Sequence, residues 1–261
     1  MLTKRLIACF DIIHGMVTKA VQFQDNIDVA PAAELAGRMY AAQVDELIFY
    51  DVTASSERRG IDLETVRQVA RRVFIPFTVG GGIKTLDDMY EALGAGAEKV
   101  SVDSMAVRSP QIIAEGAKAF GSQCVVLSTQ VKRAPRQPSG YEVYIDGARL
   151  ATGMDAIEWI KRGQALGAGE ICLNSIDNDG TLGGYDLDLM RLAQEAVSVP
   201  LIASGGAGAP EHLSALFTQT QAQAAIISSM LYSPRMARNY TVRELKEYLG
   251  GCGVPVRPTG A

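Results

Sequence analysis

With 261 residues, 48% of them hydrophobic, the chain can bury the core of one α/β barrel or of two ordinary domains. A net charge of −4 gives no electrostatic basis for binding nucleic acid, and no apolar run is long enough for a transmembrane helix. The basic N-terminus leads directly into a strand pattern without a signal-peptide core, so a cytoplasmic protein is expected.

Cysteine, histidine and acidic patterns argue against a metal site. The cysteines lack zinc-site and disulfide spacing and indicate reduced thiols: Cys9, Cys124, Cys172 and Cys252. His14 and His212 are too few for a multi-histidine centre. The acidic turn at residues 177–181 lacks the glutamate that completes a calcium loop.

Short apolar runs alternate with stretches of helical periodicity. Strands are predicted near residues 5–11, 46–51, 76–80, 98–103, 124–130, 169–174, 200–204 and 223–228. Helices are predicted near residues 31–43, 61–72, 85–95, 109–120, 153–167, 186–197, 210–219 and 241–249. This alternation indicates parallel strand pairing. No linker-like composition interrupts residues 1–261, so one domain is expected.

Two connections are longer than the rest. Residues 14–30 follow the first predicted strand, and residues 132–152 follow the fifth. Long strand-to-helix loops of a barrel lie at its catalytic mouth and can act as lids, although tolerated insertions are the alternative.

Three glycines, Gly80, Gly81 and Gly82, lie where an apolar run changes into a helical pattern. Glycine allows close approach of backbone N–H groups, and a helix N-terminus carries partial positive charge. The segment suits a phosphate or another anion, with a tight turn that binds nothing as the alternative.

A repeat strengthens the anion-binding interpretation. Four pairs of like residues are each separated by 124 positions: Glu46 and Glu170, Pro76 and Pro200, Gly82 and Gly206, Ser104 and Ser228. The constant offset indicates two similar half-chains, each with its own glycine turn. Together with the strand–helix alternation, it predicts a closed (β/α)8 TIM barrel with a two-fold half-barrel repeat rather than an open doubly wound sheet.

Polar residues at strand ends are the candidates for chemistry. Asp11 ends the first strand and could act as a general acid or base, or cap the next turn. Asp51 ends the second strand. Gln130 occupies the position in the fifth strand that echoes Asp11, and its amide can hydrogen-bond but cannot transfer a proton.

Asp103 ends the fourth strand, beside the first glycine turn. A carboxylate about 5 Å from a phosphate charge is repelled by roughly 3 kcal/mol at an effective dielectric of about 20. Asp103 therefore points away, is protonated, or adjoins a less charged group.

Four charges lie at the opposite, N-terminal strand ends: Arg5, Glu46, Lys99 and Glu170. Two cations and two anions could form an ion-pair ring at the barrel floor. From pattern alone, ordinary surface charge is the alternative that we favour.

Together these segments resemble the cyclase subunit of imidazole glycerol phosphate synthase, from histidine biosynthesis. The matching motifs span nearly the whole chain: KRLIACFD (4–11), DELIFYDVTAS (45–55), FTVGGGI (77–83), GSQ (121–123), SID (175–177), DGT (179–181), GYD (184–186), ASGGAG (203–208) and VRELKEYL (242–249). The sister isomerase family shares the repeat but matches these motifs less well.

The resemblance implies an enzyme that uses ammonia to cleave a ribulosyl-aminoimidazole-carboxamide nucleotide. The products are imidazole glycerol phosphate and an aminoimidazole carboxamide ribotide. It also implies a glutaminase partner at the N-terminal barrel face, and no cofactor. The four charges match the family's ammonia gate, and this match now favours a gate over ordinary surface charge.

The resemblance assigns substrate or phosphate binding to a set of mouth residues: Lys19, Gly81, Gly82, Asp103, Ser104, Asp179, Gly180, Gly205, Gly206, Ser228 and Ser229. In the first long loop, Met16 and Ala20 replace an arginine and a glycine of the family.

The chain departs from the family at two mouth positions. Asp11 matches the first of two catalytic aspartates, but Gln130 stands where the family has the second. Asp103 stands where the family has an asparagine at a phosphate site. One positioned acid–base group contributes about 10² to 10⁴ in rate, so this combination points to an altered site.

Three functions stay open on the sequence. The chain could be the ordinary synthase subunit with Gln130 tolerated. It could be a diverged paralogue that uses glutaminase-derived ammonia on a different, less phosphorylated substrate. It could also be a non-catalytic subunit that binds a glutaminase, an alternative that Asp11 and the four gate charges disfavour.

Overall fold

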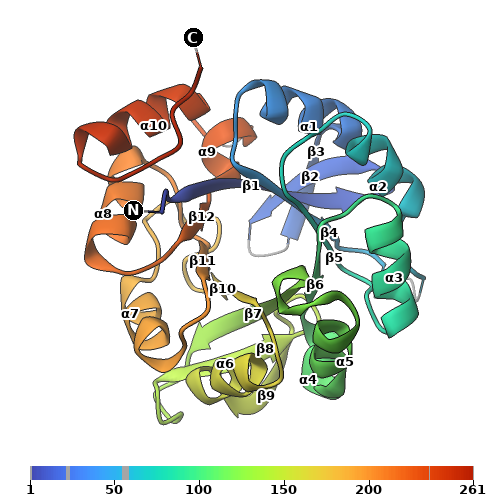
Figure 1. Cartoon of the computed structure of the whole chain (residues 1–261). Helices are drawn as coiled ribbons and strands as arrows, with labels where there is room; N and C mark the ends of the chain where they lie inside the picture. Colours follow the sequence, from blue (N-terminus) through green and yellow to red (C-terminus); the bar gives the residue numbers. More distant parts are fainter. Residues whose placement is uncertain (1, 22–23, 55–58, 235, 261) are drawn as a thin grey trace.

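In the computed structural model, which describes residues 2–21, 24–54, 59–234 and 236–260, the predicted strands form a closed barrel (Figure 1). Among these residues, eight parallel strands follow one another in the order β1, β4, β5, β6, β7, β10, β11, β12, and β12 pairs with β1. Their bounds are Arg5–Ile13 (β1), Glu46–Asp51 (β4), Phe77–Gly80 (β5), Lys99–Val102 (β6), Val125–Arg133 (β7), Glu170–Ser175 (β10), Leu201–Ser204 (β11) and Ala224–Ile226 (β12). The predicted (β/α)8 TIM barrel is confirmed.

The longer helices surround the barrel and cover the outer face of its strands (Figure 1). They are Ala32–Ala41 (α1), Leu63–Ala70 (α2), Leu86–Gly94 (α3), Gln111–Phe120 (α5), Ala156–Ala165 (α6), Leu187–Ala196 (α7), Pro210–Gln219 (α8) and Val242–Gly251 (α10). Two short helices, Ser104–Arg108 (α4) and Ser228–Tyr232 (α9), and the 3₁₀ turn Ser122–Cys124 (η1) were not predicted. The strand predicted over 223–228 ends at Ile226 because α9 begins at Ser228.

Local capping chemistry sets several helix starts. Thr85 and Thr241 form capping boxes with Asp88 and Glu244. The Asp155 side chain accepts hydrogen bonds from two N–H groups of the first turn of α6, so this helix begins later than the predicted residue 153.

The two long connections are β-hairpins rather than loops. Met16–Val21 (β2) and Gln24–Pro31 (β3) pair antiparallel after β1, while Tyr141–Ile145 (β8) and Leu150–Asp155 (β9) do so after β7. Both β1 and β7 have nine residues. Each continues past its barrel neighbours and offers an edge on which its hairpin pairs.

Alternation along the strands divides the apolar residues between two layers. One set faces outward and packs under the helices, including Phe10, Phe49 and Phe77. The other fills the inside of the barrel: Ile7, Cys9, Ile48, Val126, Cys172, Ile202, Ala224 and Ile226. Inward positions on neighbouring strands therefore lie in stacked layers between the two ends of the barrel.

Within the described ranges, no helix combines the length and apolar character needed to span a bilayer.

Candidate active site

Four charged side chains form a closed ion-pair ring at the N-terminal end of the barrel. Arg5 Nη1 lies 2.6 Å from Glu46 Oε1, and Arg5 Nη2 pairs with Glu170. Lys99 Nζ lies 2.9 Å from Glu170 Oε2 and 3.6 Å from Glu46 Oε2. Burial alone would lower the pKa of Arg5, but Glu170 and Glu46 outweigh it and hold the pKa above its usual value. Each cation therefore bridges both carboxylates.

At the opposite end, Asp11, Lys19 and Asp179 lie close enough to interact. Lys19 Nζ is 3.9 Å from Asp11 Oδ2 and 5.9 Å from the centre of the Tyr232 ring. Burial raises the pKa of Asp11, and Lys19 opposes that rise. Burial also raises the pKa of Asp179, where Lys19 opposes the rise and Asp11 adds to it. A carboxyl suited to proton transfer thus adjoins a cation suited to an anionic ligand.

A second polar cluster joins the ends of β6, β7 and β10. Asn174 Nδ2 donates to Gln130 Oε1 at 2.7 Å, and the Gln130 side chain lies near enough to the Asp103 carboxyl to lower its pKa. Burial raises the pKa of Asp103 to about 7, although Gln130 and Ser104 lower it. Of the alternatives open for Asp103, the raised pKa favours protonation of its carboxyl.

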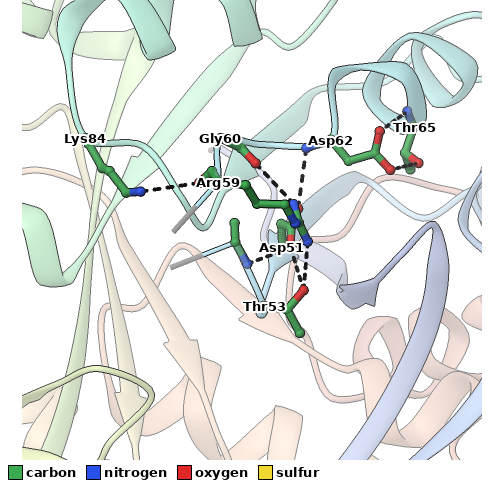
Figure 2. A network of polar contacts seen from close by, with 8 residues as sticks. Asp51, Thr53, Arg59, Gly60, Asp62, Thr65 and Lys84 are labelled. Carbon is green, nitrogen blue, oxygen red and sulfur yellow. Dashed lines mark hydrogen bonds and ion pairs between the residues drawn. The ribbon is translucent and has the colours of Figure 1, made fainter. Parts of the chain in front are cut away.

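The first glycine turn is supported by Asp51 and the segment that follows β4 (Figure 2). Arg59 pairs with both Asp51 oxygens, at 2.5 Å to Oδ2 and 2.9 Å to Oδ1, and also donates to Thr53 Oγ1. Lys84 Nζ, just after the turn, donates to the Arg59 carbonyl at 3.3 Å. Asp51 is 6% exposed, and its carboxylate pairs with Arg59, which holds the segment after β4 against the glycine turn.

The two glycine turns pack alike. A Cβ on Gly81 would lie 2.2 Å from the Asp51 carbonyl oxygen, and a Cβ on Gly205 would lie 2.7 Å from that of Ser175. Both glycines have positive φ. Gly81 and Gly205, like Asp51 and Ser175, are 124 positions apart, so the half-barrel repeat extends to the backbone contact that requires glycine.

The serines predicted at the mouth make structural contacts. Ser228 Oγ accepts from the Cys9 N–H and donates to the Cys9 carbonyl, both at 2.8 Å, so its hydroxyl anchors α9 to β1. Ser104 Oγ accepts from the Asp146 N–H at 2.9 Å. Ser229 is half-buried in the first turn of α9. A ligand near Ser228 would therefore meet its backbone rather than its hydroxyl, which is already hydrogen-bonded to Cys9.

The remaining predicted residues can be placed as well. A Cβ on Gly82 would meet the Ala54 side chain, and a Cβ on Gly206 would meet the Gly184 carbonyl oxygen. Gly180 is half-buried beside Asp179. The side chain of Ala20 lies outside the described residues. In the part of the chain that the structure describes, no three histidine, cysteine, aspartate or glutamate side chains gather as a metal site would require.

Comparisons with known proteins agree with this geometry. Residues 5–237 match the family model described as histidine biosynthesis protein. The chain belongs to this family. It is 53% identical to the imidazole glycerol phosphate synthase subunit HisF of Desulforapulum autotrophicum, over 99% of this chain and 100% of the relative. It is 52% identical to the HisF subunits of Desulfosudis oleivorans, over 98% and 99%, and of Syntrophobacter fumaroxidans, over 99% and 100%.

The resemblance to the cyclase subunit is thereby confirmed for the whole chain. The roles of individual residues at the mouth and in the charged ring stay predictions. The side chains of Asp103 and Gln130, the two positions predicted to differ from the family, lie near each other.

Sequence reasoning missed two residues that organise the mouth, Asn174 and Arg59. Asn174 follows Glu170 and Cys172 in the inward alternation of β10, and that period-two pattern could have indicated it. Arg59 had no comparable signal, because its pairing with Asp51 depends on how the segment between them folds back.

Proposed function

We propose that this chain is the cyclase subunit of an imidazole glycerol phosphate synthase. It uses ammonia to cleave a ribulosyl-aminoimidazole-carboxamide nucleotide to imidazole glycerol phosphate and an aminoimidazole carboxamide ribotide. The full-length similarity to HisF subunits supports this assignment. The observation that carries this proposal is a closed ion-pair ring at one end of the barrel, formed by Arg5, Glu46, Lys99 and Glu170. The other end of the barrel holds Asp11 beside Lys19.

The mouth has the groups that such a reaction needs. Asp11 is placed for proton transfer, and Lys19 beside it neutralises charge on the substrate or on Asp11. The glycine turns at Gly81 and Gly205 offer backbone N–H groups to the two phosphate ends of the substrate. Their 124-residue relation supports one anion site in each half-barrel.

A glutaminase subunit would dock at the N-terminal face and release ammonia at the charged ring. Between ring and mouth, the inward side chains are small or apolar apart from a few hydroxyls, such as Tyr50, which lies 3.2 Å from Ser101 Oγ. Ammonia is small and neutral, so it can pass where a hydrated ion is excluded. As part of the same proposal, the subunit works in the cytoplasm without a metal or organic cofactor.

The direct test is turnover of the ribulosyl nucleotide with an ammonium salt, which removes the need for a partner. We expect turnover by the unaltered protein and a loss of about 10² to 10⁴ in Asp11→Asn. Rescue of a histidine-requiring strain that lacks its own cyclase subunit is the second readout. No turnover and no rescue, despite good expression, would sink the proposal.

A second candidate is a diverged cyclase that acts on a less phosphorylated substrate. A carboxyl at position 103, next to the first glycine turn, is the observation that favours it. Ligand screening against the unaltered protein separates the two: tight binding of a monophosphorylated analogue, with none of the bisphosphorylated nucleotide, would support this second function.

A further inference from the structure

On the basis of the proposed function, we propose that Asp103 is the second proton-transfer group of the mouth, held in position by Gln130 and Asn174. Asp11 and Asp103 then divide the acid–base work between opposite parts of the barrel rim. Gln130, which cannot transfer a proton itself, is a positioning residue.

The first step concerns where Asp103 points. Along β6, Lys99 reaches the charged ring and Ser101 meets Tyr50 inside the barrel. Asp103 directly follows β6 as the N-cap of α4, two positions beyond Ser101, and it lies close enough to the inward Cys172 to add to the rise that burial and Glu170 cause in the pKa of that thiol. Its carboxyl therefore faces the barrel axis at the mouth end.

The second step concerns the amide that holds it. The Gln130 carbonyl oxygen is occupied by Asn174 Nδ2 at 2.7 Å, so the Gln130 NH₂ group is the end that remains for Asp103. Asn174 is 8% exposed, so its contact with Gln130 lies inside the barrel. Ser104 Oγ donates to Asp103 Oδ1 at 3.5 Å, and we assign Asp103 Oδ2 to the proton and the substrate.

The third step concerns charge. The groups that act on Asp103 are Gln130 from β7, Ser104 and Arg108 from α4, Asp146 beyond β8 and Cys172 from β10. Arg108 and Asp146 pair with each other at 2.5 Å, so their opposite effects largely cancel. Burial then dominates and raises the pKa of Asp103 to about 7. Asp11, by contrast, has a cation 3.9 Å away.

Two carboxyls whose environments differ in this way take different roles. Asp103 is the acid: as the substrate carbon–nitrogen bond breaks, its electron pair stays on the leaving nitrogen, which takes the proton from Asp103. Asp11 is the base: the nitrogen of ammonia bonds to the ketone carbon of the ribulosyl group, the C=O π bond breaks toward oxygen, which takes a proton from water, and the nitrogen loses a proton to Asp11. Net proton transfer is balanced, and exchange with solvent at the mouth resets both groups.

Substrate binding favours the same assignment. A phosphate at the adjacent first glycine turn would raise the pKa of Asp103 further, since it disfavours a second negative charge nearby. Asp103 is then protonated when the substrate is bound. This removes the repulsion that a carboxylate would otherwise exert on a phosphate at this turn.

The experiment measures kcat and KM against pH with the ribulosyl nucleotide, at a fixed concentration of free ammonia. For the unaltered protein we expect kcat/KM to fall as pH rises above about 7, because only protonated Asp103 is an acid. In Asp103→Asn, kcat should fall by about 10² to 10⁴ with little change in KM, and this inflection should vanish. Asp188→Asn, at an exposed carboxylate on α7, is the matched control and should behave like the unaltered protein.

The exchange variant Asp103→Asn with Gln130→Asp puts the carboxyl on β7 and the amide on β6. It should recover at least part of the activity lost in Asp103→Asn, because the same two groups face each other. Gln130→Leu should shift the inflection of kcat/KM to higher pH, since the polar group that lowers the pKa of Asp103 is lost.

The outcomes separate this inference from the proposed function. No turnover by the unaltered protein would overturn both. Robust turnover by the unaltered protein, with Asp103→Asn equally active or keeping the inflection near pH 7, would overturn only the role of Asp103.

Discussion

Gly81 shows how a single residue can be required by backbone contact alone. Its φ is 80°, in the left-handed region, and a Cβ there would lie 2.2 Å from the Asp51 carbonyl oxygen. Side chains are disfavoured at such φ values, and no real Cβ comes so close to backbone. Both effects act on the turn that is predicted to hold an anion.

Gly81→Ala should therefore lower the free energy of unfolding by at least about 1–3 kcal/mol, the range of a strained backbone position. Gly37→Ala is the control, because Gly37 lies inside α1 with nothing near its Cβ position. That change should stabilise the protein by up to about 1 kcal/mol. Urea unfolding of both variants checks the pair, and equal stability would contradict the packing argument.

Asp103 gives a residue-scale prediction about pH. Its pKa is about 7 in the folded protein, against about 3.9 in an unfolded chain. A raised folded pKa contributes stability that is complete below about pH 4 and is lost as pH rises to about 7. Asp103→Asn should thus gain stability relative to the unaltered protein between those limits. Urea unfolding of both proteins across this range measures the difference, which a flat profile would refute.

At the scale of elements, α10 is tied to the start of β4 by a buried ion pair. Lys246 Nζ lies 2.7 Å from Asp45 Oδ1 and donates to the Gln43 carbonyl at 2.8 Å. Asp45 Oδ2 accepts from the Leu6 N–H at 2.9 Å, which extends the contact to β1. The side chains of Lys246 and Asp45 are 3% and 6% exposed. The last helix is thus held to the first two barrel strands.

Lys246→Met should cost about 3–5 kcal/mol of unfolding free energy, because it leaves Asp45 buried without its cation. Lys161→Met is the control: its partner Glu158 is 67% exposed, and such a pair contributes about 0–1 kcal/mol. Urea denaturation at neutral pH compares the two. A loss at Lys246 no larger than at Lys161 would show that the buried pair does not hold α10.

At the scale of the whole molecule, the barrel separates two charged sites at its opposite ends. The ring of Arg5, Glu46, Lys99 and Glu170 closes the N-terminal end, and the groups around Asp11 and Asp103 lie at the other. The apolar layer inside the barrel lies between these two sites. Under the proposed function, only ammonia passes from one end to the other.

Lys99→Met should therefore separate the two nitrogen sources. With a glutaminase subunit of this family bound, the ratio of glutamine-driven to ammonium-driven turnover should fall by about tenfold, a typical coupling between distant sites. Ammonium-driven turnover should change little, because Lys99 lies at the ring rather than at the mouth. If turnover fell equally with glutamine and with ammonium, Lys99 would act on the stability of the whole barrel rather than on the passage of ammonia.

Most of the fold could be predicted because its signals are local. The alternation of apolar runs and helical patterns, with the 124-residue repeat, indicated the closed barrel that the structure shows. The sequence predicts loops where the structure has the hairpins β2–β3 and β8–β9, because the pairing of these strands depends on the overhang of β1 and β7. The short helices α4 and α9 have too few residues for a periodic signal.

The candidate site divides in the same way. The residue types at the strand ends can be read from the sequence alone, since inward positions follow the period of two along each strand. Which of these residues meet depends on the folded barrel: the four charges join in a closed ring, Arg59 pairs with Asp51, and Asn174 bonds to Gln130 near Asp103. The reason is that contacts between strands distant in sequence, and the burial that raises the pKa of Asp103, exist only once the barrel has closed.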